Sequence, residues 1–214
     1  MKILSNHFKK SIYLIAAIGF SSSFAGSYED FFKAVELNDS RAVQTLLQRG
    51  FDANSRDPKG QTGLFLALRG GSLDVAEVLI KAPNLDVNTL NEAGESALMM
   101  AALKGQPALS QRLIERGAAI DKQGWSPLHY AATGPDPSVV KLLLDRGAPI
   151  DARSPNGSTP LMMAAQYGSE ASAELLLQRG ADPRIRNDRG LSAADFARLS
   201  NREALAAGLE RAQR

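Results

Sequence analysis

Few residues in this 214-residue chain could carry out chemistry. The chain contains two histidines, His7 and His129, and no cysteine. Nucleophilic catalysis by serine or cysteine needs a base within hydrogen-bond reach of the nucleophile. His7 lies in the basic, apolar N-terminal segment, so only His129 is left for such a pair. We therefore predict that the chain has no catalytic centre and is not an enzyme.

The potential metal ligands are equally sparse. One histidine outside the N-terminal segment and no cysteine cannot build a typical zinc or copper site. Five aspartates recur once in each unit of a repeat described below: Asp52, Asp86, Asp121, Asp151 and Asp182. Aspartate is typical of turns, whereas a calcium loop clusters acids at alternate positions within about twelve residues. We predict no metal and no cofactor.

Two further motifs have both a functional and a structural interpretation. Arg69-Gly70-Gly71 follows an expected helix rather than a strand, which indicates a turn and not a phosphate-binding loop. The pairs Met99-Met100 and Met162-Met163 could capture a metal or sense an oxidant. Their register places at least one methionine of each pair in the core, so we favour core filling.

The first twenty-five residues differ from the rest of the chain. Lys2, Lys9 and Lys10 precede an apolar stretch from Ile12 to Phe20, and Ser23-Phe24-Ala25 supplies small residues at a cleavage site. This segment resembles a secretory signal peptide cleaved after Ala25. The alternative is a membrane anchor, but the apolar stretch is shorter than the roughly 20 residues that span a bilayer. We expect an exported protein, in the periplasm of a Gram-negative bacterium.

Removal of residues 1–25 changes the net charge. The whole chain has 25 basic and 23 acidic residues, and the segment contains three lysines and no acid. The remainder therefore has a net charge of −1. A nucleic-acid-binding domain usually has a basic surface, so we predict no nucleic-acid partner and no stable membrane insertion after cleavage.

An internal repeat organises the chain after this segment. Its leading glycines are 34, 30, 33 and 33 residues apart. The five matching segments are Gly60-Gln-Thr-Gly-Leu-Phe-Leu-Ala, Gly94-Glu-Ser-Ala-Leu-Met-Met-Ala, Gly124-Trp-Ser-Pro-Leu-His-Tyr-Ala, Gly157-Ser-Thr-Pro-Leu-Met-Met-Ala and Gly190-Leu-Ser-Ala-Ala-Asp-Phe-Ala. A period of this length is typical of repeat architectures.

Each unit carries the signals of two short helices. A hydroxyl residue stands at each expected N-cap: Thr62, Ser96, Ser126, Thr159 and Ser192. Pro127 and Pro160 suit the first helical position. The second helices are predicted over Val75 to Lys81, Ala108 to Arg116, Val139 to Arg146 and Ala171 to Arg179. A closing glycine follows three of these helices and the outer helix of the first pair: Gly50, Gly117, Gly147 and Gly180.

The pattern resembles the ankyrin repeat, whose signature Thr-Pro-Leu-His-x-Ala-Ala is matched from Ser126 to Ala132. Gly180-Ala181-Asp182 matches its closing turn. The resemblance implies an all-α ankyrin-repeat solenoid of stacked helix-turn-helix units with short β-hairpin-like finger loops. It also implies that His129 links helix starts and loops by hydrogen bonds. The expected units are an N-cap at about 28–57, repeats at about 58–91, 92–121, 122–154 and 155–187, and a C-cap at 188–214.

The chain departs from the pattern at three places. The loop from Asp121 to Gly124 is three residues shorter than that from Asp151 to Gly157, which predicts a truncated finger. Ala82-Pro83-Asn84 replaces the usual closing Gly-Ala, and Gly134-Pro135-Asp136-Pro137 replaces a glycine turn. We expect both of these turns to be rigid and irregular.

The resemblance implies a protein partner on the concave face, formed by the finger tips and the first helices. By register, the residues available there are Arg56, Lys59, Gln61, Arg69, Leu90, Glu95, Leu103, Lys104, Trp125, Thr133, Arg153, Gln166, Tyr167 and Arg186. Trp125 and Tyr167 stand out because large aromatic residues often dominate interface energetics. Trp125 could instead cover core exposed by the truncated finger. The arginines could favour an acidic partner or be solvated.

These observations lead to one principal functional hypothesis and one alternative. The principal hypothesis is a non-enzymatic, monomeric module that binds a partner protein through its concave face. The alternative is an immunity or inhibitor protein that occludes a toxin or an exported enzyme, because ankyrin-like repeats serve this role in some bacteria. The sequence does not separate the two.

Overall fold

The computed structural model describes residues 22–213, which contain twelve helices and no strand. One isolated antiparallel bridge joins Arg56 to Thr62 at the base of a loop. The predicted signal peptide lies outside the described residues as far as residue 21. Helix α2 (Ser22–Glu36) passes through the predicted cleavage point after Ala25, and cleavage there stays a prediction.

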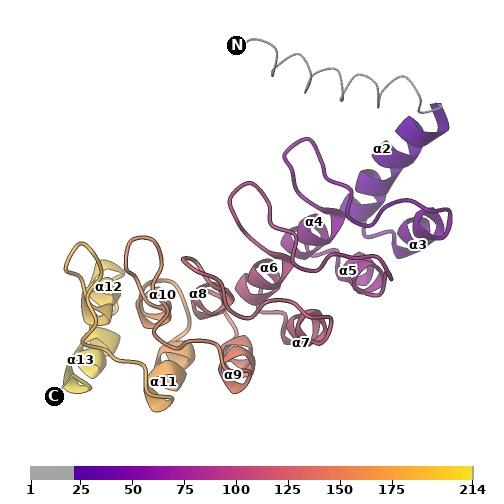
Figure 1. Ribbon diagram of the computed structural model, residues 1–214. Helices are drawn as coiled ribbons and strands as arrows, with labels where there is room; N and C mark the ends of the chain where they lie inside the picture. Colours follow the sequence, from indigo (N-terminus) through magenta and orange to yellow (C-terminus); the bar gives the residue numbers. More distant parts are fainter. Residues whose placement is uncertain (1–21, 214) are drawn as a thin grey trace, which may run out of the picture.

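The helices form two rows, with loops projecting beyond one of them (Figure 1). The inner row consists of α2, α4 (Gly63–Gly70), α6 (Ala97–Leu103), α8 (Pro127–Thr133), α10 (Pro160–Gln166) and α12 (Ala193–Leu199). The outer row consists of α3 (Ser40–Gln48), α5 (Leu73–Ile80), α7 (Pro107–Glu115), α9 (Pro137–Asp145), α11 (Glu170–Gln178) and α13 (Glu203–Arg211). Each inner helix packs on the next inner helix and on its own outer helix. The predicted helical solenoid is confirmed.

The predicted N-caps are where the inner helices begin. At four of them the hydroxyl accepts a hydrogen bond from the N–H three residues later: Thr62 from Phe65, Ser96 from Met99, Thr159 from Met162 and Ser192 from Asp195. At the fifth, the hydroxyl of Ser126 lies 2.8 Å from Nδ1 of His129. The four bonds to backbone N–H groups satisfy donors that a helix start leaves free, which explains why these short helices begin at fixed residues.

Small residues bring the inner helices close together. The pairs Ala101-Ala102, Ala131-Ala132 and Ala164-Ala165 are buried. Closer still is Gly168, where an added Cβ would lie 2.0 Å from the carbonyl oxygen of Ala132. Both methionines of each pair, Met99-Met100 and Met162-Met163, are buried in the same core, so core filling is confirmed.

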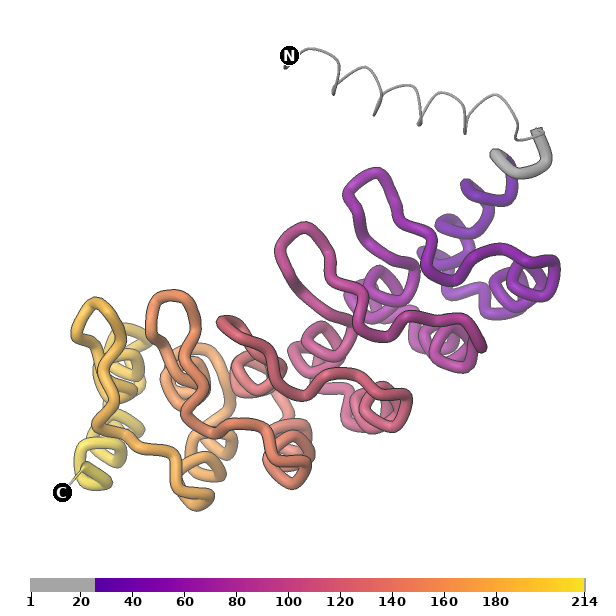
Figure 2. Tube along the Cα trace, in the orientation of Figure 1, coloured from indigo at the N-terminus to yellow at the C-terminus, as the bar shows by residue number. Residues whose placement is uncertain are grey.

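The loops ahead of the inner helices form fingers, each named here for the helix it precedes. They span residues 52–62, 86–96, 119–126, 149–159 and 182–192. Four fingers close with a backbone hydrogen bond across the turn: Asp57 N to Gln61 O, Asn91 N to Glu95 O, Ser154 N to Ser158 O and Asn187 N to Leu191 O. The α8 finger, within the described chain, makes no such bond and forms only a narrow turn (Figure 2), as predicted.

A second set of hydrogen bonds, which we call the finger ladder, joins successive fingers. Its bonds run from Asp86 N to Asn54 Oδ1 (2.7 Å), from Ala119 N to Asn88 Oδ1 (2.8 Å) and from Asp182 N to Asp151 Oδ1 (3.2 Å). Between the α8 and α10 fingers the equivalent acceptor is Asp121, but the equivalent donor position is Pro149, which has no N–H. The ladder is therefore interrupted at this junction.

The recurring aspartates have two structural roles. Asp52, Asp86 and Asp182 each accept a hydrogen bond from the backbone N–H two residues later, so their predicted turn role is confirmed. Asp151 belongs to the ladder instead. The described residues contain no group of three or more histidine, cysteine or acidic residues placed to hold a metal ion.

Candidate functional site

A hollow of about 250 Å³ opens at the inner helices beside the shortened α8 finger. Its lining residues are Leu103, Trp125, His129, Tyr130, Thr133, Met163 and Tyr167. We call this the aromatic hollow. Sites for drug-sized ligands generally occupy about 300–1,000 Å³. The aromatic hollow is smaller, and its size suits a single inserted side chain.

Trp125 forms a wall of the aromatic hollow and also covers the core. Its half-buried ring packs against the core cluster, and it meets the ring of His129 edge-on with 5.3 Å between centroids. The two sequence-based interpretations of Trp125 are thus compatible. Tyr167, at the C-terminal end of α10, leaves 63% of its surface exposed. A large aromatic residue this exposed is available to a partner.

His129 lines the hollow and connects two units. Its Nδ1 lies 3.2 Å from the N–H of Ser126, and its Nε2 lies 3.0 Å from the carbonyl oxygen of Ser158. A backbone N–H can only donate and a carbonyl can only accept, so His129 is neutral with its proton on Nε2. Burial lowers the pKa of His129, against the opposing effect of its backbone carbonyl partners. The linking role implied by the resemblance is confirmed.

Tyr130 joins the aromatic hollow to a carboxylate. Its hydroxyl donates to Oε1 of Glu95 at 2.8 Å, and Oε2 of Glu95 accepts from the amide of Asn91, also at 2.8 Å. Burial, followed by the hydrogen bond to Glu95, raises the pKa of Tyr130 well above its usual value. Tyr130 is therefore protonated at any physiological pH and donates continuously to Glu95.

Three of the arginines expected on the concave face brace the fingers. Arg56 donates to the carbonyl oxygens of Gly60 (2.7 Å) and Leu90 (2.9 Å). Arg153 donates to the carbonyl oxygen of Arg186 at 3.0 Å. A planar guanidinium can satisfy several carbonyl oxygens that a tight turn leaves unpaired. Because their guanidinium groups already bond to backbone carbonyl oxygens, these arginines are less available to an acidic partner than the sequence suggested.

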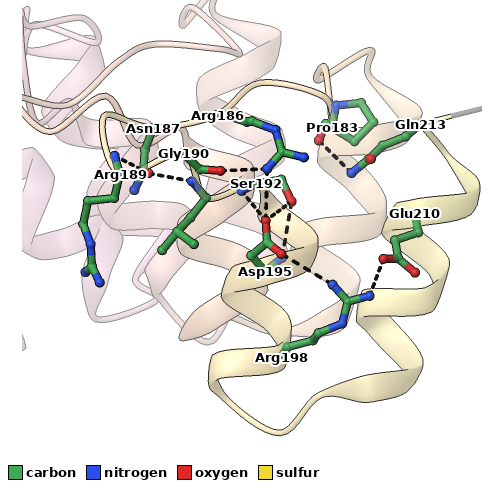
Figure 3. Close-up of polar contacts among 11 residues, drawn as sticks. Pro183, Arg186, Asn187, Arg189, Gly190, Ser192, Asp195, Arg198, Glu210 and Gln213 are labelled. Carbon is green, nitrogen blue, oxygen red and sulfur yellow. Dashed lines mark hydrogen bonds and ion pairs between the residues drawn. The ribbon is translucent and has the colours of Figure 1, made fainter.

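The third of these arginines belongs to a polar cluster at the last unit (Figure 3). Arg186 donates to the carbonyl oxygen of Gly190 at 2.7 Å and lies 3.5 Å from the carboxylate of Asp195. Asp195 accepts hydrogen bonds from the N–H and hydroxyl of Ser192, which lower its pKa. Arg198 lies between Asp195 and Glu210 and so ties α12 to α13. The cluster stabilises the last helix pair.

The remaining predicted residues are not among those that line the aromatic hollow. Lys59, Leu90 and Lys104 are exposed, whereas Gln61, Glu95 and Gln166 are half-buried. Lys59 and Arg69 line a separate depression of about 620 Å³ beside α2 and the α4 finger. Leu103, Trp125, Thr133 and Tyr167 are the predicted residues that line the aromatic hollow.

Three lining residues are absent from the set predicted by register: His129, Tyr130 and Met163. His129 and Met163 occupy core positions of the repeat and are buried there. They line the hollow from two adjacent units, His129 from α8 and Met163 from α10. The shortened finger itself was the available sequence signal.

Comparisons with known proteins assign a family. The family described as ankyrin repeats, in three copies, matches residues 31–123 and 107–187, which together span more than half of the chain. Human photoreceptor ankyrin repeat protein is 34% identical over 87 residues, covering 39% of this chain and 19% of that protein. Human Notch-regulated ankyrin repeat-containing protein is 33% identical over 90 residues, covering 40% of this chain and 78% of that protein.

The matched segments are mostly small parts of the relatives. The chain spans 8% of human transient receptor potential cation channel subfamily A member 1, to which it is 33% identical over 85 residues. Many solved structures match, and one of them aligns with a TM-score of 0.72 and 26% identity, covering 85% of this chain and 97% of that one. That structure is the Bd0816 predatory endopeptidase from Bdellovibrio bacteriovorus in complex with immunity protein Bd3460.

Proposed function

Because this chain belongs to the ankyrin-repeat family, a non-catalytic interaction fold, we propose that it binds a partner protein through the aromatic hollow and the fingers beside it. The aromatic hollow carries this proposal. It combines Trp125 and Tyr130 with the exposed ring of Tyr167 at the one junction where the finger ladder is interrupted. Aromatic anchors in small pockets contribute much of the binding energy at protein interfaces.

Capture of the partner tests this proposal. The full chain, tagged at its C-terminus and expressed in its own organism, is compared with Tyr167→Ala and Leu199→Ala variants. The two side chains are 63% and 61% exposed, so neither substitution removes a buried contact, and only Tyr167 lines the aromatic hollow. We expect Tyr167→Ala to weaken binding at least tenfold, a loss of about 1.4 kcal/mol, and Leu199→Ala to leave it unchanged. If both substitutions changed binding equally, the partner would bind outside the aromatic hollow.

A second, more specific function is that of an immunity or inhibitor protein directed against a peptidase. The support is the structural match to a chain of the endopeptidase–immunity protein complex, which extends over almost the whole of that chain. Such a protein would block its partner by stoichiometric occlusion, without turnover. The activity of a captured peptidase is measured with increasing amounts of this chain. We expect activity to fall to near zero at one equivalent, and undiminished activity of the saturated complex would exclude inhibition.

We also propose that the chain is exported, acts in a periplasm and is a monomer without a nucleic-acid partner. The support is the N-terminal segment with its small residues at Ala25 and the net charge of −1 beyond it. Among the residues that the structure describes, no helix is long and apolar enough to cross a membrane. Mass spectrometry of the protein from cell fractions tests the location. An N-terminus at Gly26 in the periplasmic fraction is expected, and an intact Met1 in the cytoplasm would contradict it.

A further inference from the structure

The carboxylate of Glu95 accepts a hydrogen bond from Tyr130 of the aromatic hollow and takes part in no ion pair among the described residues. We infer that the aromatic hollow receives an arginine side chain from the partner protein, with its guanidinium bound to Glu95. This inference rests on the proposed protein-binding function and specifies the chemistry of the partner.

Glu95 is held in place by neutral donors. The hydroxyl of Tyr130 and the amide of Asn91 each donate to one of its oxygens at 2.8 Å. A carboxylate offers about four acceptor positions, so these two bonds fix the group and leave acceptor positions free. Partly removed from water and oriented in advance, it is suited to a charged donor from outside.

The cations of this chain do not fill that role. Glu95 takes part in none of the ion pairs among the described residues. The ammonium group of Lys122, in the α8 finger, lies near Gly94, the residue before Glu95, and donates to the carbonyl oxygen of Gln123. The finger arginines Arg56 and Arg153 donate to backbone carbonyl oxygens instead. The charge of Glu95 is available to a partner.

Tyr130 places this carboxylate at the edge of the hollow, because its ring lines the hollow while its hydroxyl bonds to Glu95. Trp125, Tyr167 and Met163 also line the hollow. A cation within about 6 Å of an aromatic ring centre is attracted to the face of the ring. The hollow thus joins aromatic faces to a fixed negative charge.

Arginine matches both parts of this site. Its aliphatic stem can lie against the apolar lining, while its planar guanidinium stacks on aromatic rings and bonds to a carboxylate through two N–H groups. An aliphatic side chain would fill the hollow but leave Glu95 without a counter-charge. Lysine would supply the charge but not the planar, two-pronged geometry.

The only tryptophan of the chain, Trp125, makes a direct test possible, because its fluorescence reports on the aromatic hollow. The full chain is titrated with the blocked tripeptide acetyl-Gly-Arg-Gly-amide and with acetyl-Gly-norleucine-Gly-amide. The first should produce a saturable change in Trp125 emission, with an affinity at least tenfold higher than that of the second. Glu95→Gln should weaken the arginine peptide about tenfold.

Glu92→Gln is the matched control, since it removes the same charge from an exposed position of the same finger. It should leave both affinities unchanged, and thermal melting verifies that both variants are folded. The inference is overturned by equal affinity for the norleucine peptide, by an unchanged affinity in Glu95→Gln, or by no saturable change with the arginine peptide. Partner capture that depends on Tyr167 would then still uphold the proposed function.

Discussion

Two junctions between neighbouring fingers show how the array combines regularity with a site. Between the α6 and α8 fingers, Asn88 accepts from Ala119 N at 2.8 Å and donates to the carbonyl oxygen of Gly117 at 3.0 Å. Between the α8 and α10 fingers this ladder is missing, because the donor position is occupied by Pro149. There His129, through its bond to Ser158, links α8 to the following finger.

The difference indicates where the solenoid can be open. A regular ladder holds adjacent fingers together and covers the starts of the inner helices. The interrupted junction lacks these bonds, and the aromatic hollow lies there, lined by Trp125 and Tyr167 among others. Stability at this junction depends instead on close helix packing and on His129. Three substitutions test this comparison.

The largest effect is expected from Gly168→Ala, at the interrupted junction. The added Cβ would lie 2.0 Å from the backbone oxygen of Ala132, which cannot move without separating α8 from α10. We expect the free energy of unfolding to fall by about 3 kcal/mol, as measured by urea denaturation. Gly70→Ala is the control, because its Cβ meets open space at the end of α4. It should keep or raise the stability, and a similar loss in both variants would contradict the packing argument.

An intermediate effect is expected from breaking the ladder where it is complete. Asn88→Ala removes both cross-finger bonds of this residue and should cost about 2 kcal/mol, at roughly 1 kcal/mol for each bond. Asp121→Ala changes the equivalent residue at the interrupted junction, which is exposed and outside the ladder. It should change the stability by less than about 0.5 kcal/mol. Chemical denaturation of the two variants measures both changes in the free energy of unfolding. Equal losses in Asn88→Ala and Asp121→Ala would show that the ladder is not interrupted.

The smallest effect is the pH dependence that His129 gives to the interrupted junction. Burial holds its pKa in the folded chain below the unfolded value of 6.5, so the unfolded chain binds the proton more readily. The contribution of neutral His129 is therefore complete above pH 6.5 and declines as the pH falls below that value.

His129→Met should remove this part of the pH dependence, since Met99 and Met162 occupy the equivalent position in the units on either side. At pH 7.5 the substitution should cost about 1 kcal/mol through the lost bond to Ser158. Thermal melts between pH 5 and pH 8 measure both effects. If the difference in melting temperature between the wild type and His129→Met stays constant over this pH range, the assignment of a neutral, buried His129 is refuted.

The fold was predictable from the sequence because its signals are local. A hydroxyl N-cap such as Ser96 and a proline such as Pro160 mark a helix start within a few residues, and the repeat multiplies that evidence. The alternation of inner and outer helices and the shortened α8 finger followed from the same spacing. Such features can be predicted without knowing which units are in contact.

The site was predictable only in part. Register pointed to Trp125 and Tyr167, but the bond from Tyr130 to Glu95 connects residues 35 positions apart and the contact of His129 with Ser158 connects residues 29 apart. Side chains on neighbouring units approach each other in ways that spacing alone does not specify. Exposed arginines were ambiguous for a related reason: the carbonyl oxygens that engage Arg56 become available only once the finger turns have formed.

The packing of each inner helix on its immediate neighbours in the row also affects how the chain reaches its native state. Among the described residues, the main helix contacts join helices of the same unit or of adjacent units, so the contact order is low and the entropic barrier to loop closure is small. In a linear array of this kind, structure can start at any adjacent pair of units and spread outward. The N-terminal units can therefore acquire their structure before the last helix pair has folded.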